Sequence, residues 1–219
     1  MHSGGSAKEA EERAQFLLRL RARGIGDLPL LRAMELTPRS LFLPQRFADI
    51  AARDIALPIG CGQTSTPPST LALMIGVLKF KEGAKILEVG TGSGYATALM
   101  SQMGAEILTL ERCQTLALEA TERLAAFGLD NVRVAFADGL DFTGAPEFDR
   151  ILVHGVIEEP ATHLTRLLAP GGALVAVMAD ESEQRIVRLA RDSLGDIGAG
   201  AKGFARTFMP LAPGLARAL

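Results

Sequence analysis

The stretch LEVGTGSGY, residues 87–95, restricts the fold of this chain more than any other feature. An apolar run precedes it, a helical pattern follows it, and Gly90, Gly92 and Gly94 lie between the two. Glycine tolerates positive φ and lets a ligand approach the backbone closely. The first turn of a helix presents free N–H groups. The stretch therefore predicts a tight turn from strand to helix that can bind a ligand.

Apolar runs alternate with helical patterns after this turn. Strands are predicted at residues 84–89, 105–111, 131–137, 148–154 and 171–178, helices at 95–103, 113–127 and 161–168, and a final antiparallel pair of strands at 184–191 and 203–209. Nearly continuous apolar strands separated by helices are typical of a parallel sheet covered on both faces. The expected fold class is α/β, with a Rossmann-like, doubly wound, mostly parallel seven-stranded sheet.

The N-terminal part of the chain has a different pattern. Two helices are predicted at residues 7–23 and 28–36, an irregular segment punctuated by proline at 38–60, and a helix at 67–79. Residues before the first helix resemble a flexible tail. We therefore expect an N-terminal helical extension, residues 1–60, packed on a catalytic domain of residues 61–219.

Charge and cysteine content narrow the classes of partner. A net charge of -2 gives no basic field for a nucleic-acid backbone. No apolar stretch approaches the ~20 residues of a membrane span, and the first ten residues lack a signal peptide's apolar run. Cys61 and Cys113 are far apart in the sequence, so reduced thiols are expected rather than a disulfide or a zinc site. These features favour a cytoplasmic protein, monomeric or weakly dimeric, without metal, nucleic acid or membrane.

Acidic residues end three consecutive predicted strands, and the first of them is Glu88. It lies two residues before Gly90, where a carboxylate would repel a pyrophosphate but attract the ammonium of a methionine group. The third glycine, Gly94, also comes one residue earlier than in the dinucleotide-binding pattern G-x-G-x-x-G. Both features favour S-adenosylmethionine over a dinucleotide as the cofactor.

The other two acids match the rest of such a cofactor. Glu111 can accept bonds from both ribose hydroxyls, with a solvated strand end as the alternative. Asp138 can accept a bond from the adenine amino group while Gly139 leaves room for the ring, with a simple Asx turn as the alternative. The predicted cofactor-binding set also includes Thr64, Thr91, Ser93 and Arg112.

Four stretches resemble one known family closely. They are RDIALPIGCGQTSTPPSTLALM, KILEVGTGSGYATALMSQM, LERCQTLALEATERLAAFGLDNVRVAFADG and LLAPGGALVAVM. Together they resemble the protein-L-isoaspartate (D-aspartate) O-methyltransferases from about Pro38 to Met178. Many methyltransferases share the glycine turn, whereas LPIG-x-GQT is much more specific to this family.

The resemblance implies a repair reaction. The α-carboxylate of an isoaspartyl residue in a damaged protein or peptide would attack the methyl group of S-adenosylmethionine, leaving S-adenosyl-L-homocysteine. The ester would then collapse to a succinimide, which hydrolyses partly to normal aspartate. A carboxylate is already ionised at neutral pH, so this transfer needs no general base.

Two sites depart from the family pattern and leave alternatives open. Thr66 stands at the family's active-site serine, so the catalytic hydroxyl is that of Thr66 or of neighbouring Ser65, unless Thr66 only caps the next helix. His154 stands where the family has threonine, at a strand end that is expected to face the reaction centre. It could donate to a carboxylate or act as a base toward a hydroxyl or amine, or simply be packed.

The residues after His154 raise a further question about the acceptor. The family has small alanines there, whereas this chain has the bulkier Val156 and Ile157. The alternatives are therefore a methyltransferase of the same fold acting on a different acceptor, or a catalytically impaired homologue that keeps only the S-adenosylmethionine site.

Overall fold

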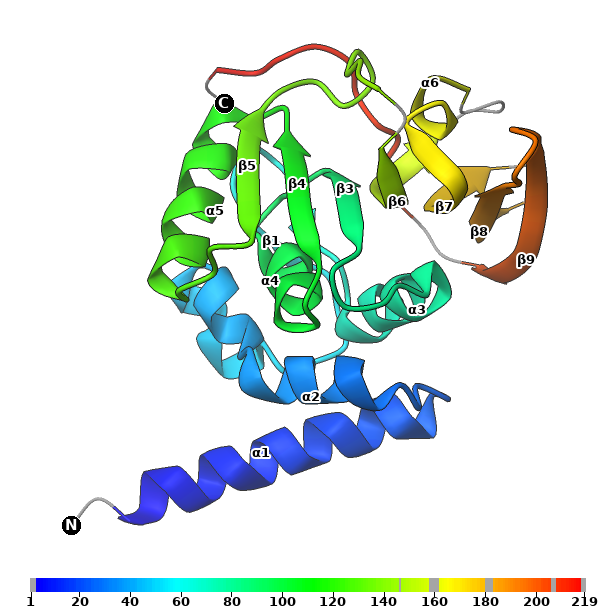
Figure 1. The fold of residues 1–219 in the computed structure, drawn as a ribbon. Coiled ribbons are helices and arrows are strands. Elements are labelled where there is room, and N and C mark those ends of the chain that lie inside the picture. The colour runs from blue at the N-terminus through cyan, green and yellow to red at the C-terminus, as the bar shows by residue number, and fades with distance from the viewer. Residues whose placement is uncertain (1–2, 146, 158–161, 180–182, 206–207, 218–219) are drawn as a thin grey trace.

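A seven-stranded sheet forms the centre of the fold in the computed structural model, which describes residues 3–145, 147–157, 162–179, 183–205 and 208–217. Its strands are β3 (Lys85–Val89), β4 (Glu106–Glu111), β5 (Val132–Phe136), β6 (Phe148–Ile157), β7 (Leu168–Ala179), β8 (Gln184–Arg191) and β9 (Ile197–Ala205). Their order is β5-β4-β3-β6-β7-β8-β9 (Figure 1). The pairs from β5 to β7 are parallel, and β8 and β9 pair antiparallel. The predicted fold class is confirmed.

The chain changes direction across the sheet beside β3. It runs outward from β3 to β4 and β5, then returns to place β6 on the other side of β3. The crossover helices are α4 (Tyr95–Gln102), α5 (Gln114–Ala126) and α6 (Thr162–Thr165). In such sheets a ligand binds outside the carboxyl ends of the strands where the order reverses. This places the candidate site at the carboxyl ends of β3, β4 and β6.

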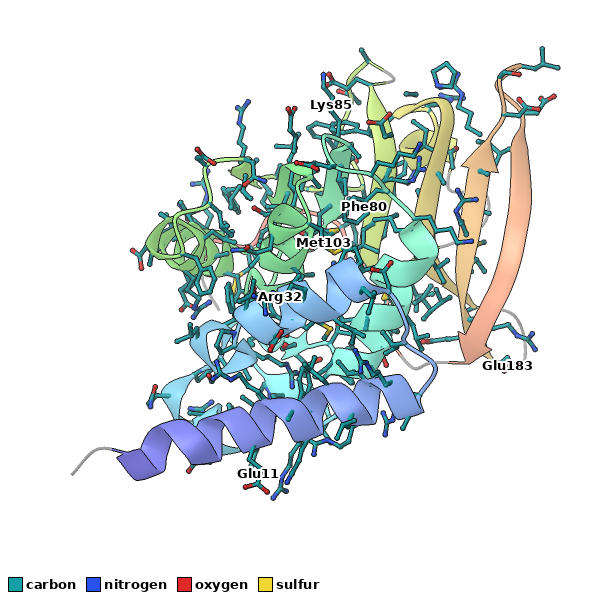
Figure 2. The ribbon with its side chains drawn as sticks, turned by 60° about the horizontal axis from the view of Figure 1, so that its bottom comes forward. Glu11, Arg32, Phe80, Lys85, Met103 and Glu183 are labelled. Carbon is teal, nitrogen blue, oxygen red and sulfur yellow. A yellow bond between two sulfur atoms is a disulfide. The ribbon has the colours of Figure 1, made fainter. Side chains whose placement is uncertain are left out.

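Several helices and a short hairpin come before the sheet. The helices are α1 (Ser3–Ala22) and α2 (Leu28–Leu36), followed by the 3-10 helices η1 (Arg39–Phe42) and η2 (Gln45–Ile50), the hairpin strands β1 (Leu57–Pro58) and β2 (Thr64–Ser65), and helix α3 (Pro68–Leu78). Figure 2 shows α1 and α2 side by side along one side of the molecule, with Glu11 on the outer face of α1. The Asp27 side chain caps α2 by accepting a hydrogen bond from the backbone N–H of Leu30 at 3.0 Å.

Two clusters of buried hydrophobic side chains lie on the two faces of the sheet. Successive residues of a strand point to opposite faces, so Ile86 lies in one cluster and Leu87 in the other. The Ile86 cluster also contains Phe16 and Leu30, so the N-terminal helices share this core. The two-domain division stays a prediction, and residue 60 lies in the turn between β1 and β2.

Several boundaries differ from the sequence prediction. Helix α1 begins at Ser3, where a tail was expected, and α6 is shorter than the helix predicted at 161–168. The last strand is residues 197–205 rather than 203–209, and 206–207 lie outside the described residues. Asp192 explains the earlier start, because its Oδ1 accepts bonds from Leu194 and Asp196 and closes a tight turn. Among the described helices, none has the length and apolar character needed to cross a bilayer.

The expectation of two separate thiols is wrong in the structure. Cys61 and Cys113 form a disulfide, with their Cα atoms 6.8 Å apart. Cys61 lies in the β1–β2 turn and Cys113 directly precedes α5. The hairpin packs on α5 at Gly60. This glycine lies so close to Leu116 that a Cβ added to it would be 3.2 Å from a methyl carbon of Leu116. The two cysteines are 52 residues apart in the sequence, and the sequence alone did not indicate that the fold brings them together.

Candidate functional site

The glycine-rich stretch forms the predicted turn between β3 and α4. Gly90, Gly92 and Gly94 have φ values of 93°, 55° and 86°, which favour glycine strongly. The N–H of Gly90 donates to the carbonyl of Leu110 at 2.8 Å and anchors the turn to β4. A Cβ on Gly90 would lie 3.2 Å from the Cβ of His154, so glycine also lets the end of β6 approach the turn.

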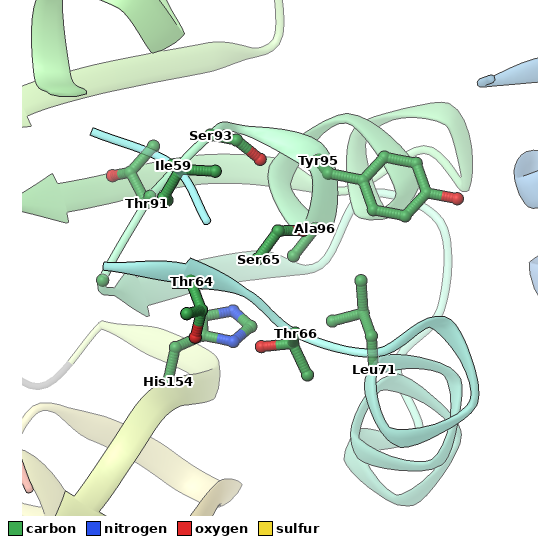
Figure 3. Close-up of a pocket in the computed structure, with 12 residues that line it drawn as sticks. Ile59, Thr64, Ser65, Thr66, Leu71, Thr91, Ser93, Tyr95, Ala96 and His154 are labelled. Atoms are coloured by element: carbon green, nitrogen blue, oxygen red, sulfur yellow. The ribbon is translucent and has the colours of Figure 1, made fainter. Parts of the chain in front are cut away.

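A pocket lies between this turn and the β1–β2 hairpin (Figure 3). It is lined by residues from the hairpin and α3, from the turn, from the first residues of α4 and from the end of β6: Ile59, Thr64, Ser65, Thr66, Leu71, Gly90, Thr91, Gly92, Ser93, Tyr95, Ala96 and His154. The structure thus brings all three predicted catalytic residues to one pocket together with residues 90–93 of the glycine turn. Ile59, Leu71, Tyr95 and Ala96 were missed, because apolar or buried residues carry no chemical signature in the sequence.

The two candidate hydroxyls of this pocket differ in their partners. The Oγ of Ser65 accepts a hydrogen bond from Nη2 of Arg39 at 3.1 Å, and Ser65 is buried. The N-cap of α3 is Pro67, without a side-chain cap, so capping by Thr66 is not observed. Within the described parts of the chain, the Thr66 hydroxyl has no hydrogen-bond partner. Of these two candidate hydroxyls, that of Thr66 is therefore the one without a competing partner among the described residues.

His154 is held by Glu88. Its Nε2 lies 2.9 Å from Oε1 of Glu88, and 12% of its side chain is exposed. In the view of Figure 3 the imidazole lies between Thr64 and Thr66. Because Nε2 is bonded to the carboxylate, Nδ1 is the ring nitrogen left for a ligand.

Glu88 itself lies beneath the turn rather than in the pocket wall. Its carboxylate has no exposed surface, and its second oxygen accepts bonds from Thr97 at 2.5 Å and Thr109 at 2.7 Å. The Thr109 hydroxyl is also 2.6 Å from that of Thr91 in the turn. This buried network fixes the turn and His154 together. Direct contact of Glu88 with an ammonium group stays a prediction.

Glu111 supports the turn from β4. Its Oε2 accepts a bond from the N–H of Gly92, and its Oε1 accepts one from the N–H of Cys113, both at 2.8 Å. Each carboxylate oxygen has two lone pairs, so each can accept one further hydrogen bond. The arrangement is compatible with the predicted ribose contact, which stays a prediction.

The C-terminal segment lies over the carboxyl ends of several strands, shown in red in Figure 1. Nε of Arg112 donates to the carbonyl of Gly214 at 2.7 Å, and the N–H of Gly214 donates to Oδ2 of Asp138. Oδ1 of Asp138 accepts a bond from Leu140, which is the alternative Asx turn. The cofactor contacts of Arg112 and Asp138 stay predictions.

Gly139 and the residues after His154 are constrained by packing. A Cβ on Gly139 would lie 2.4 Å from a methyl carbon of Val89, so no larger residue fits there. Ile157 is buried in the core, and the backbone of Val156 bonds to Met209 and Leu211. Neither bulky side chain lines the pocket. Among the described residues, no group of three histidine, cysteine or acidic side chains could hold a metal ion.

Comparisons with known proteins assign the family. The family model of protein-L-isoaspartate(D-aspartate) O-methyltransferase matches residues 11–214. The protein-L-isoaspartate O-methyltransferase of Azorhizobium caulinodans is 40% identical over 216 residues, covering 98% of this chain and 99% of the relative. That of Rhodopseudomonas palustris is 42% identical over 210 residues, covering 95% and 97%.

A solved structure agrees with this assignment. It is a protein-L-isoaspartate O-methyltransferase of Plasmodium falciparum in complex with S-adenosyl-L-homocysteine, with a TM-score of 0.77 and 25% identity. The match covers 90% of this chain and 97% of that chain. From the family model and these near full-length relatives, the chain belongs to the protein-L-isoaspartate (D-aspartate) O-methyltransferase family.

Proposed function

We propose that this protein transfers the methyl group of S-adenosylmethionine to the α-carboxylate of L-isoaspartyl residues in damaged proteins and peptides. The family assignment supports the reaction. The observation in this chain that carries the proposal is the pocket itself. It joins the glycine turn, where the methyl donor would bind, to the Thr66 hydroxyl, which has no hydrogen-bond partner among the described residues, and to His154.

The residues around the turn fit such a cofactor. Gly90 and Gly92 allow close approach of a ligand, and the buried Glu88 carboxylate favours a cationic group above the turn over a phosphate. Thr91 and Ser93 would surround the methionine end. Glu111, with acceptor capacity left on both oxygens, would bind the ribose. S-adenosylmethionine supplies an electrophilic methyl group on a sulfonium sulfur.

The remaining cofactor contacts would lie at the neighbouring strand ends. Asp138 and Gly139 would border the adenine, and Arg112 would hold the C-terminal segment against this side of the site. Thr64, which is exposed on the hairpin, would lie between cofactor and acceptor. No residue on this side has to move a proton, so the proposed roles are binding and orientation.

The acceptor carboxylate needs orientation rather than activation. It is ionised at neutral pH, so the task of the protein is to hold an attacking oxygen at ~3 Å from the methyl carbon and in line with the leaving group. We assign the holding contact to the Thr66 hydroxyl. A neutral donor orients the carboxylate without withdrawing as much of its charge as an arginine would. His154 lines the same pocket and would lie beside the bound acceptor.

Turnover on a matched pair of peptides tests this proposal. One peptide carries an L-isoaspartyl residue and the other a normal aspartyl residue at the same position. We expect a methyl ester on the isoaspartyl peptide alone, detected by methanol release in mild base. Equal labelling of both peptides, or none of either, would refute the assigned substrate.

A different acceptor is the second candidate, and His154 is the observation that favours it. A histidine whose Nε2 is held by a carboxylate can use its other nitrogen as a base toward a hydroxyl or amine. Methylation of such a group gives a product that is stable to mild base, unlike an ester. A screen of acceptor pools with labelled cofactor would therefore separate the two candidates by the base stability of the product.

The cellular location, the oligomeric state and the partners of the protein are also proposals. We infer a cytoplasmic protein, monomeric or weakly dimeric, that meets its damaged protein substrates transiently and binds neither nucleic acid nor membrane. The net charge of -2 supports the exclusion of nucleic acid. Cell fractionation and analytical ultracentrifugation measure the location and the oligomeric state.

A further inference from the structure

The guanidinium of Arg39 is enclosed behind the pocket, with 4% of the residue exposed. Arg39 begins the 3-10 helix η1. Its Nη1 donates to the carbonyl of Ala51 at 3.2 Å and also lies 3.4 Å from that of Arg53. Its Nη2 lies 3.1 Å from the carbonyl of Ile55. One side of the guanidinium therefore holds the chain between η2 and the β1–β2 hairpin.

The same guanidinium also binds Ser65 and Thr66, which carry the two candidate hydroxyls of the pocket. Nη2 lies 3.1 Å from the carbonyl of Ser65, from the Oγ of Ser65 and from the carbonyl of Thr66. An Nη group carries two hydrogens, so these bonds are shared among the acceptors. Both peptide groups next to the Thr66 side chain are thus bound to Arg39.

A purely stabilising role explains this arrangement poorly. Among the described residues, no carboxylate forms an ion pair with Arg39. Burial lowers the pKa of Arg39 to about 10, so the group is still charged at neutral pH. Burying a charge without a counter-ion is unfavourable, and a packed apolar side chain often stabilises a core at least as well. The retained charge instead defines where several carbonyls must lie.

Arg39 is also close to the opposite wall of the pocket. Burial raises the pKa of Tyr95, the first residue of α4, and the nearby charge of Arg39 partly offsets this rise. Tyr95 lines the pocket and is 3% exposed. Figure 3 shows the Tyr95 ring directed away from His154. The Arg39 guanidinium therefore lies behind both Ser65–Thr66 and the start of α4.

We propose that Arg39 is a positioning residue for methyl transfer: it fixes the carbonyls of Ser65 and Thr66 so that the Thr66 hydroxyl points into the pocket. Arg39 lines no part of that pocket, so its effect on the reaction passes through Thr66. The catalytic consequence rests on the proposed function, whereas the consequence for the hairpin does not.

Substitution of Arg39 by lysine tests the proposal. Lysine keeps the charge but replaces a planar fork with a single ammonium, which cannot bind both groups of carbonyls at once. We expect R39K to lower kcat on an isoaspartyl peptide by about tenfold or more, with the Kd of S-adenosyl-L-homocysteine changed by less than about twofold. Arg39→Gln, which keeps two N–H donors without the charge, is the second variant.

Arg150 provides the matched control. Its Nε donates to the carbonyls of Leu78 and Lys79, far from the pocket near the amino end of β6. R150K makes the same chemical change at another arginine that binds backbone carbonyls. We expect R150K to lower the melting temperature but to keep kcat within about twofold of the wild type. A loss of kcat in R39K no larger than in R150K would overturn the positioning role.

A double-mutant cycle separates positioning of Thr66 from a general effect. If Arg39 acts through the hydroxyl, T66V removes what Arg39 positions, and R39K/T66V has the same kcat as T66V alone. Fully additive losses in kcat would contradict the proposal.

Hydrogen exchange keeps the test independent of the substrate. A wild-type protein that methylates no isoaspartyl peptide would refute the proposed function, and the exchange of the backbone amides of residues 57–66 would then decide the role of Arg39. We expect R39K and R39Q to accelerate this exchange by about tenfold or more, and R150K to leave it unchanged. Unchanged exchange in R39K and R39Q would refute the positioning role.

Discussion

Nε2 of His154 lies 2.9 Å from Oε1 of Glu88, and this contact joins the carboxyl end of β6 to a fully buried acid on β3. The two strands are neighbours at the position where the strand order reverses. Gly90 leaves the space that the His154 backbone needs. The histidine that replaces the family's usual threonine is therefore built into the support of the glycine turn.

Replacement of Glu88 by glutamine tests this support. The carboxylate accepts bonds from Thr97, Thr109 and His154, and an amide would turn one accepting oxygen into a donor facing other donors. We expect E88Q to lose about 1–3 kcal/mol in the free energy of unfolding. Urea denaturation measures it. Glu106→Gln, the same change at an exposed position of β4, should stay within about 0.5 kcal/mol of the wild type.

The Thr66 hydroxyl can be removed without changing the shape of the side chain. We expect T66V to lower kcat by about tenfold or more and to leave the affinity for S-adenosyl-L-homocysteine nearly unchanged, because the lost hydrogen bond is to the acceptor. T66S keeps the hydroxyl and should keep turnover. Steady-state kinetics and calorimetry measure the two effects, and full activity of T66V would shift the role to Ser65 or to the backbone.

Asp138 is predicted to border the adenine. We expect D138A to weaken the binding of S-adenosyl-L-homocysteine by about fivefold or more, since a hydrogen bond to the ligand and the anchor of Gly214 are both lost. Calorimetric titration gives the Kd. Asp141→Ala, at an exposed position of the same loop, is the control. An unaltered Kd in D138A would remove Asp138 from the site.

The disulfide between Cys61 and Cys113 makes a prediction about stability. It closes a loop with a sequence separation of 52 residues, and its removal should lower the free energy of unfolding by about 2–4 kcal/mol. Unfolding curves with and without reductant measure the difference, with the C61S/C113S double variant insensitive to reductant. Two titratable thiols in the unreduced, denatured protein would show that the pair is not bonded.

The strands of the sheet and the main parts of the pocket could be predicted from the sequence. Apolar runs of strand length mark β3, β4, β6 and β7, because strands buried on both faces are largely apolar. The glycines marked the turn, because few other residues adopt its backbone angles. Strand ends meet at one edge of a parallel sheet, so Glu88, Glu111, Asp138 and His154 were predicted to lie at that edge, whereas their roles toward a ligand stay predictions.

Contacts between distant segments could not be predicted in this way. The bonds of Arg39 to Ser65 and of Asp138 to Gly214 join residues 26 and 76 positions apart. No periodicity of the sequence encodes such pairs, and the same is true of the disulfide. The glycine-rich strand β9 lacks the alternation of apolar and polar residues that marks a strand, so its start was predicted too late.

A crystal structure of the protein with bound S-adenosyl-L-homocysteine tests the central claim most directly. We predict the homocysteine portion against the turn of residues 90–94, with its sulfur facing the pocket of Thr66 and His154 and its ribose at Glu111. Binding of this molecule elsewhere, with the turn of residues 90–94 making no contact to it, would contradict the account.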